Sequence, residues 1–112
     1  MIKVIRIDDT AIGHTDIEGN SVIGVVNQSS SNVKAEGKYI ARNGDNVAFP
    51  SHPHALDEGV PIDYLEHNVA IIANRSKKIN GQSIAAHGDV VPVVDGAGPN
   101  ATLVATAIKT NV

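Results

Sequence analysis

Histidine is the residue type in this sequence with the clearest capacity for chemistry. The chain contains five histidines: His14, His52, His54, His67 and His87. Histidine is the commonest metal ligand in proteins, and its unperturbed pKa leaves the imidazole mostly neutral and available near pH 7. The sequence contains no cysteine, which excludes disulfides, thiolate ligands and cysteine nucleophiles. A metal site in this chain is therefore expected to rest on imidazole nitrogens.

A repeated nine-residue block gives these histidines a common pattern. The segment Gly37-Lys-Tyr-Ile-Ala-Arg-Asn-Gly-Asp45 aligns without a gap with Gly81-Gln-Ser-Ile-Ala-Ala-His-Gly-Asp89. A degenerate third copy opens the chain, where Ile5-Arg-Ile-Asp-Asp9 parallels the end of the block. Each Gly-Asp pair predicts a tight turn, because glycine supplies a positive φ and aspartate bonds nearby backbone N–H groups. Three strand-then-Asp units therefore predict one bend repeated around a single axis.

The histidines occupy related places in these units. His14 follows the turn at Asp9, and His52 and His54 follow the turn at Asp45. His67 opens the run that leads back toward the third unit. If the units wrap around an axis, the segments after equivalent turns converge at one end. Three or four imidazoles would then meet, a set suited to tetrahedral zinc.

Composition and turn signals predict an all-β domain of short strands covering residues 1–112. Ten glycines and five prolines interrupt a chain rich in valine and isoleucine, and aromatic residues are scarce. Glu36-Gly37 and Asn80-Gly81 are hairpin-turn signals. Strands are expected over Ser21 to Val26, Val69 to Ala73 and Ala101 to Ile108. Pro50 to Glu66 is interpreted as a loop, with at most one helical turn at Ala55 to Glu58.

Charge and hydropathy exclude several classes of protein. The net charge is −3, and the only basic cluster, Arg75 with Lys77 and Lys78, is too small for a nucleic-acid footprint and fits a solvated strand edge. The N-terminal segment has no continuous apolar region of the kind found in secretory signals, and no apolar run reaches membrane-spanning length. We expect synthesis in the cytoplasm and export, if any, by another machine.

The repeated block resembles the PAAR-repeat family, whose recurring sequence is Gly-Lys-Pro-Ala-Ala-Arg-Val-Gly-Asp. Residues 37–45 match this block at six of nine positions. Ile-Gly-His14 after the first turn, Asn32-Val33 ahead of the block, and Lys78-Ile-Asn-Gly81 are further shared features. The resemblance extends from Ile5 to about Val104.

The resemblance implies a small cone of short strands with pseudo-threefold internal repeats and a metal ion near the apex. Such a cone caps a trimeric β-helical spike (a VgrG protein or a phage tail spike), one tip per trimer. The implied role is structural and not enzymatic: the tip sharpens the spike of a phage tail or a type VI secretion system, touches the target membrane transiently, and is carried in the virion tail or exported through the machine.

Departures from the family pattern affect the metal ligands most. The family uses three histidines and a cysteine, and His14, His52 and His67 match the histidine positions. The position of the cysteine falls near Val93. We expect His54 as the fourth ligand because it shares the predicted loop with His52, with Asp95 and His87 as alternatives. Zinc is the expected metal, and iron is possible with an all-histidine set.

Two other readings of the sequence are open. Three histidines could hold a catalytic zinc with an open position for water, beside carboxylates such as Asp57, Glu58, Asp63 and Glu66. A metal-free β-rich assembly module is the other.

For the spike tip, the base is expected to present Ile2, Val4, Leu103 and Val104 to the spike.

Overall fold

The structure is a computed structural model that describes residues 2–93 and 98–112. Every regular element in these residues is a β-strand. These residues contain no helix that is long and apolar enough to cross a membrane. The expected all-β class is therefore confirmed. The strands are β1 (Thr10–Thr15), β2 (Ser21–Val26), β3 (Lys34–Ala35), β4 (Lys38–Tyr39), β5 (Asn46–Asp57), β6 (Val60–Ala70), β7 (Lys78–Ile79), β8 (Gln82–Ser83), β9 (Val90–Val91) and β10 (Ala101–Val104).

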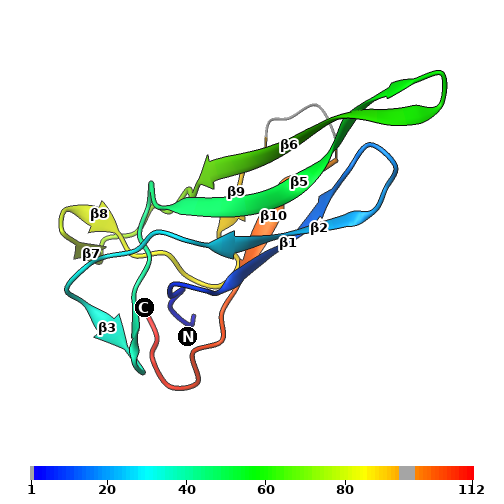
Figure 1. Cartoon of the computed structure of the whole chain (residues 1–112). Helices are drawn as coiled ribbons and strands as arrows, with labels where there is room; N and C mark the ends of the chain where they lie inside the picture. The colour runs from blue at the N-terminus through cyan, green and yellow to red at the C-terminus, as the bar shows by residue number, and fades with distance from the viewer. Residues whose placement is uncertain (1, 94–97) are drawn as a thin grey trace.

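Six of the strands form one antiparallel sheet in the order β6-β5-β2-β1-β10-β9. The sheet curls around a core of small aliphatic residues (Figure 1). Beyond the end of β6, Ile72 forms a bridge to Val90 of β9, which brings the two edges of the sheet together at one end. Strand β2 follows the bounds that its alternating pattern predicts, with every second side chain buried.

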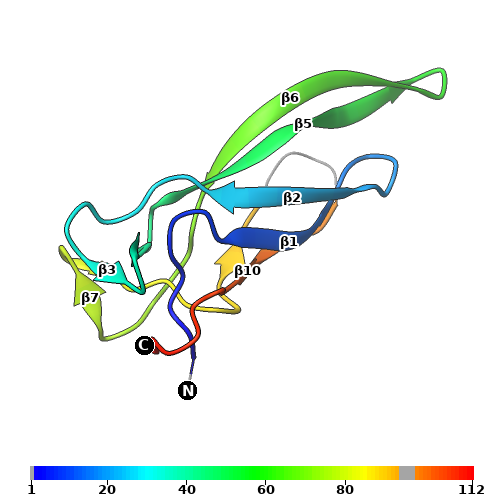
Figure 2. The same ribbon diagram turned by 60° about the horizontal axis from the view of Figure 1, so that its bottom comes forward.

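Two short hairpins and the chain termini lie together at one end of the molecule (Figure 2). The hairpin β3–β4 turns at Glu36-Gly37 and the hairpin β7–β8 at Asn80-Gly81, with φ between 51° and 87° at all four residues. Positive φ at both central residues is the requirement of the type I′ turn that suits the twist of a hairpin. The terminal segments form a third strand pair, in which Lys3 bridges Asn111. A second apolar cluster, which includes Val4, Ile40 and Ile79, joins these three strand pairs.

Each of the three Asp turns is built in the same way. In each, the Asp carboxylate accepts a backbone N–H three residues earlier at 2.8 Å, and the Asp N–H donates to the carbonyl of that same residue. The residue before each Asp has a positive φ: Asp8 at 73°, Gly44 at 87° and Gly88 at 90°. Aspartate is among the few residues other than glycine that tolerate this conformation. The pairs are Arg6 with Asp9, Arg42 with Asp45, and Ala86 with Asp89.

A closed ring of backbone hydrogen bonds joins the segments that lead into these turns. Ile5 donates to Ala85 at 3.0 Å, Ala85 donates to Ala41 at 3.1 Å, and Ala41 donates back to Ile5 at 2.9 Å. All three residues are fully buried. Because the residues at these positions in the second and third segments are alanines, three backbones can approach one another closely at the centre of the fold.

The predicted loop from Pro50 to Glu66 was wrong. These residues form most of the hairpin β5–β6, the longest feature of the chain, which projects past the rest of the sheet (Figure 1). Ala55 to Glu58, the segment interpreted as a possible helical turn, forms the end of β5 and the hairpin turn. The prolines are tolerated because Pro61 lies on an edge strand, and Pro50 and Pro53 lie past the part of β5 that pairs with β2.

The expected base residues are corrected as well. Leu103 and Val4 are buried, Leu103 in the core of the sheet and Val4 in the second apolar cluster, so neither can face a partner. Ile2 is half exposed and Val104 is partly buried. Strand β10 also ends at Val104 instead of reaching Ile108, and β6 ends at Ala70 instead of Ala73.

Candidate metal centre

Four of the five histidines come from three strands of the six-stranded sheet. His14 lies near the end of β1, His52 and His54 lie on β5, and His67 lies on β6. His52, His54 and His67 lie close enough to bind one metal ion, with their candidate ligand atoms all within 4.8 Å of one another. His14 adjoins this group through His52. The histidines that the sequence selected as ligands are therefore brought together.

Two β-bulges aim the buried histidines inward. In β1 the register shifts between Ala11 and His14, so both side chains are buried and the two residues between them are exposed. In β5 a second shift between Phe49 and His52 has the same effect. In a regular strand the side chains at these spacings would point to opposite faces. Each bulge therefore changes the phase of its strand and turns a histidine toward the interior.

The Nε2 atoms of the four rings converge. His14 Nε2 lies 3.3 Å from His52 Nε2, His52 Nε2 lies 3.1 Å from His54 Nε2, and His54 Nε2 lies 2.5 Å from His67 Nε2. In a tetrahedral zinc site with Zn–N bonds of about 2.0–2.1 Å, the nitrogens are about 3.3 Å apart. The first two distances match this value. The third distance is shorter than this value, so a metal ion bound by both His54 and His67 would require these two rings to move apart.

Backbone carbonyls fix the tautomers of three of the rings. The Nδ1–H groups donate to Pro99 O from His14 at 2.8 Å, to Pro50 O from His52 at 2.7 Å, and to Asp63 O from His54 at 2.9 Å. A carbonyl oxygen only accepts, so Nδ1 carries the proton in each ring and Nε2 of the neutral ring carries a lone pair. Such an outer hydrogen bond is typical of histidines that bind metals.

This arrangement favours a shared cation. In the neutral rings of His14, His52 and His54 the lone pair is on Nε2, so neighbouring Nε2 atoms present lone pairs to one another. A divalent ion placed between them converts the convergence of lone pairs into coordination bonds. Imidazole suits zinc, copper, iron and nickel, and an all-nitrogen set in a tetrahedral arrangement suits zinc well. The donor set therefore fits a zinc ion.

Packing around His14 and His52 limits their movement. Phe49 meets the His14 ring edge-on, with centroids 5.6 Å apart. Phe49 lies over Gly24 of β2, where a Cβ would come within 2.7 Å of its ring and of Val47. A glycine at this position therefore makes room for the aromatic ring that supports His14.

A carboxylate lies beside the centre. Asp16 follows His14 and accepts backbone N–H groups of Glu18 and Asn20 at 2.8 and 3.0 Å. Burial raises the Asp16 pKa, but these backbone hydrogen bonds and one with the Asn20 side chain outweigh burial and leave the pKa lowered. Asp16 is therefore ionised at neutral pH, and it holds the turn that follows His14.

One alternative fourth ligand, His87, is placed away from this group. His87 Nδ1 accepts the Ala105 N–H at 3.1 Å, and His87 lines a pocket with Ile2 and Lys3 near the chain termini. Val93, near the position of the family's cysteine, is buried in the apolar core. Asp95 lies outside the described residues.

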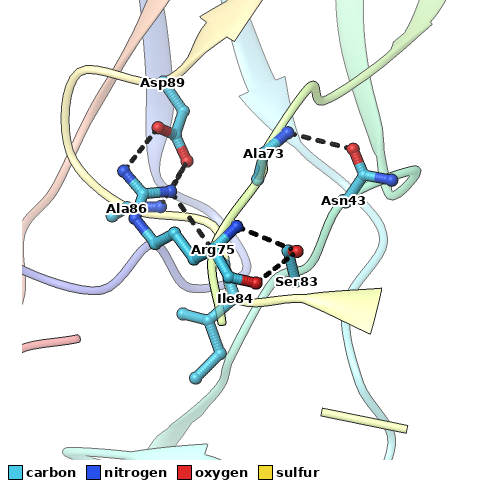
Figure 3. A network of polar contacts seen from close by, with 7 residues as sticks. All are labelled: Asn43, Ala73, Arg75, Ser83, Ile84, Ala86 and Asp89. Atoms are coloured by element: carbon cyan, nitrogen blue, oxygen red, sulfur yellow. Dashed lines mark hydrogen bonds and ion pairs between the residues drawn. The ribbon is translucent and has the colours of Figure 1, made fainter. Parts of the chain in front are cut away.

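Arg75 was missed by the sequence analysis, which assigned it to a solvated edge. Its guanidinium donates to both carboxylate oxygens of Asp89, at 2.5 and 2.8 Å (Figure 3). These hydrogen bonds with the Asp89 carboxylate raise the Arg75 pKa. Arg42 makes an equivalent pair with Asp45. Arg75 therefore replaces, from a distant position, the arginine that the third unit lacks at Ala86.

Neither a protein-family model, nor a curated protein, nor a solved structure was found to match this chain. The site is therefore interpreted from its own geometry.

Proposed function

We propose that the protein is a structural tip of a contractile injection spike, similar to the PAAR-repeat proteins, and that it caps the end of a trimeric β-helical spike as one chain per trimer. The observation that carries this proposal is the closed ring of backbone hydrogen bonds among Ile5, Ala41 and Ala85. A single chain that repeats one turn three times around a centre offers three related surfaces to a threefold partner.

The construction of the turns supports a pseudo-threefold relation among the three units. The N–H groups of Asp8, Gly44 and Gly88 each donate at 2.9 Å to the carbonyl of a later residue, and those three residues donate back to the turns. These acceptors are Val26 of β2, Ile71 directly after β6, and Leu103 of β10. A partner with true threefold symmetry can then meet one tip with all three of its chains.

The metal centre suits the mechanical demands of this role. It would join β1 to the hairpin β5–β6, which is distant from β1 in the sequence. Near its narrow end a small domain is mostly surface, and it can bury little apolar area there. When bound, zinc would supply coordination energy that becomes folding energy. His52, His54, His67 and His14 are the residues that would hold it.

A hydrolase is less well supported. A catalytic zinc site keeps one position open for water, whereas a fourth nitrogen, that of His14, lies 3.3 Å from the nearest member of the three-histidine group. The His14 and His52 side chains are buried, with 0% and 3% exposure. The geometry favours a closed, structural site.

Metal content tests whether the four histidines hold a structural zinc ion. Untagged protein should carry about one zinc per chain by elemental analysis. A His54→Ala/His67→Ala variant should lose the metal, while the control His87→Ala should keep it. Zinc at about a thousand times its Kd should stabilise the wild type by roughly 4 kcal/mol. Wild type that binds no divalent metal would refute the closed site.

The stoichiometry of the complex with a spike protein tests the capping role. Mixed with a trimeric β-helical spike protein from the same source, the zinc-loaded chain should form a complex of one tip and three spike chains in native mass spectrometry. Three tips per trimer, or no complex with the spike, would refute the capping role.

A further inference from the structure

The charges of this protein are separated between its two ends. All six lysines lie on the two short hairpins or on the terminal strand pair, at the end that holds the chain termini. They are Lys3, Lys34, Lys38, Lys77, Lys78 and Lys109. The β1–β2 turn and the hairpin β5–β6, at the other end, contain no lysine or arginine and carry six carboxylates: Asp16, Glu18, Asp57, Glu58, Asp63 and Glu66.

The lysines are distributed evenly over the three strand pairs, two on each. Lys34 and Lys38 lie on β3–β4, Lys77 and Lys78 lie at β7, and Lys3 and Lys109 lie on the terminal pair. Every one of them except the partly buried Lys3 is exposed. The three pairs surround the second apolar cluster, so the cationic groups form a rim around an apolar centre.

Carboxylates at this end are already engaged. Glu36 accepts the backbone N–H groups of Ile108, Lys109 and Thr110 at 2.9 to 3.1 Å. Asp8 lies 3.9 Å from one lysine, Lys38. The rim therefore has an excess of positive charge on a chain whose net charge is −3.

A pocket within this end offers a place for a carboxylate. It has a volume of about 350 Å³ and is lined by Ile2, Lys3, His87 and Ala105. His87 Nδ1 accepts a backbone N–H, so the neutral ring carries its proton on Nε2 and can donate from that atom. An ammonium group, an N–H donor and two apolar walls fit the side chain of an aspartate or glutamate.

We propose that this lysine-rimmed end is the docking surface for an acidic end face of a trimeric protein partner, with a carboxylate side chain of one partner chain seated in the pocket. The inference rests on the proposed capping function and adds the chemistry of the partner. Two lysines per strand pair match three copies of one acidic patch. Complementary charge accelerates association and selects the orientation in which the tip docks.

A nucleic acid is a less suitable polyanion for this surface. The three arginines, which would make bidentate phosphate contacts, are engaged within the fold: Arg6 is buried, Arg42 pairs with Asp45, and Arg75 pairs with Asp89. The six lysines circle an apolar centre instead of following a groove.

The first experiment needs no spike protein. An anionic paramagnetic cosolute should enhance amide relaxation at residues 34–38, 77–82 and 109–111 of the zinc-loaded chain more than a cationic cosolute does. At residues 57–63 the order should be reversed. Equal effects of the two cosolutes at both ends would overturn the charge separation, whatever the outcome of the capping assay.

The second experiment uses the spike. A Lys38→Gln/Lys78→Gln/Lys109→Gln variant should bind the trimer about tenfold more weakly at low salt, with a shallower dependence on salt. The control Glu18→Gln/Asp57→Asn/Glu58→Gln, with three charges removed at the other end, should bind as wild type. Capping that is unchanged in the lysine variant would overturn this inference and leave the capping function intact. Tighter binding to duplex DNA than to the spike would overturn it in favour of nucleic acid.

Discussion

Single backbone contacts decide what the histidines of this protein can do. The three carbonyls that accept Nδ1–H groups are backbone groups of Pro50, Asp63 and Pro99, so this role does not depend on their side chains. They fix the tautomer, and the bulges fix the direction of each ring. The sequence shows the ligands, but these outer contacts depend on chain positions that only the fold brings near.

The Glu36 carboxylate makes pH-dependent hydrogen bonds with backbone N–H groups near the C-terminus. Hydrogen bonds, the strongest from the Ile108 N–H, outweigh burial and lower the Glu36 pKa from 4.5 to about 2. A carboxyl whose pKa is lower in the folded state stabilises the fold above its unfolded pKa, and it loses this contribution as the pH falls from about 4.5 toward 2.

We therefore expect Glu36→Gln to unfold more easily than wild type at pH 7 and to approach wild type near pH 2. Urea denaturation of both proteins across this pH range measures the difference. Glu18→Gln, which changes an exposed carboxylate, should show no such trend. A difference between Glu36→Gln and wild type that does not shrink with falling pH would contradict this account.

Among the elements, hairpin β5–β6 shows most clearly where sequence reasoning succeeds and fails. Glu58-Gly59 has the same form as Glu36-Gly37, and its φ values of 51° and 80° are those of the same turn. This turn signal was present in the sequence but was outweighed by three prolines. Whether a proline disrupts a strand depends on which edge is paired, and pairing is a tertiary property that local pattern does not reveal.

The short hairpins were predicted correctly because their signal is local. Glu36-Gly37 and Asn80-Gly81 each lie between short extended segments, and the structure places a two-residue turn at both. The histidines of the candidate site could be selected because the repeat related their positions, and the structure places His52, His54 and His67 close enough to bind one metal ion. Arg75 could not be found in this way, because it lies outside the repeated block, whereas the second unit has its arginine inside the block at Arg42.

Shortening the hairpin tests how far the metal centre depends on its outer part. Leu56 is 50% exposed and Val60 is 60% exposed, so the tip packs little against the domain. Ala55 and Ile62 are cross-strand partners, so an Asn-Gly turn can join them in register after residues 56–61 are removed.

The shortened protein should keep its zinc, and its stability should change by about 0.5 kcal/mol or less. Elemental analysis and thermal unfolding measure both. A larger loss of stability, or loss of the metal, would show that the tip supports the centre.

At the scale of the whole molecule, the terminal strand pair takes the place of a third short hairpin, one that has no connecting turn. Lys3 bridges Asn111, and the Val112 N–H donates to Ile2 O at 2.9 Å. The Ile84 N–H of the β7–β8 region and the Val4 N–H make corresponding bonds, to Lys77 O and Thr110 O. The molecule is 49 Å long and 23 by 22 Å across, with this pair at the end opposite the long hairpin.

A circular permutant tests that equivalence. We expect a chain that joins Val112 to Ile2 through Asn-Gly, and that opens between Asn80 and Gly81, to fold and to bind zinc as wild type does. Circular dichroism, metal content and thermal unfolding compare the two. A control permutant opened between Gly24 and Val25, inside β2, should not fold. A folded control, or an unfolded test permutant, would contradict the equivalence.

The ring formed by Ile5, Ala41 and Ala85 also limits how early during synthesis the chain can complete its fold. Its first member leaves the ribosome 80 residues ahead of its last. No arc of the ring can form from neighbouring residues alone, and such distant pairings make folding slow because loop closure precedes any gain in contacts. Strand β2 and the hairpin β5–β6 must therefore wait with exposed apolar faces until the third turn emerges. During that interval the exposed apolar surface makes the nascent chain prone to aggregation.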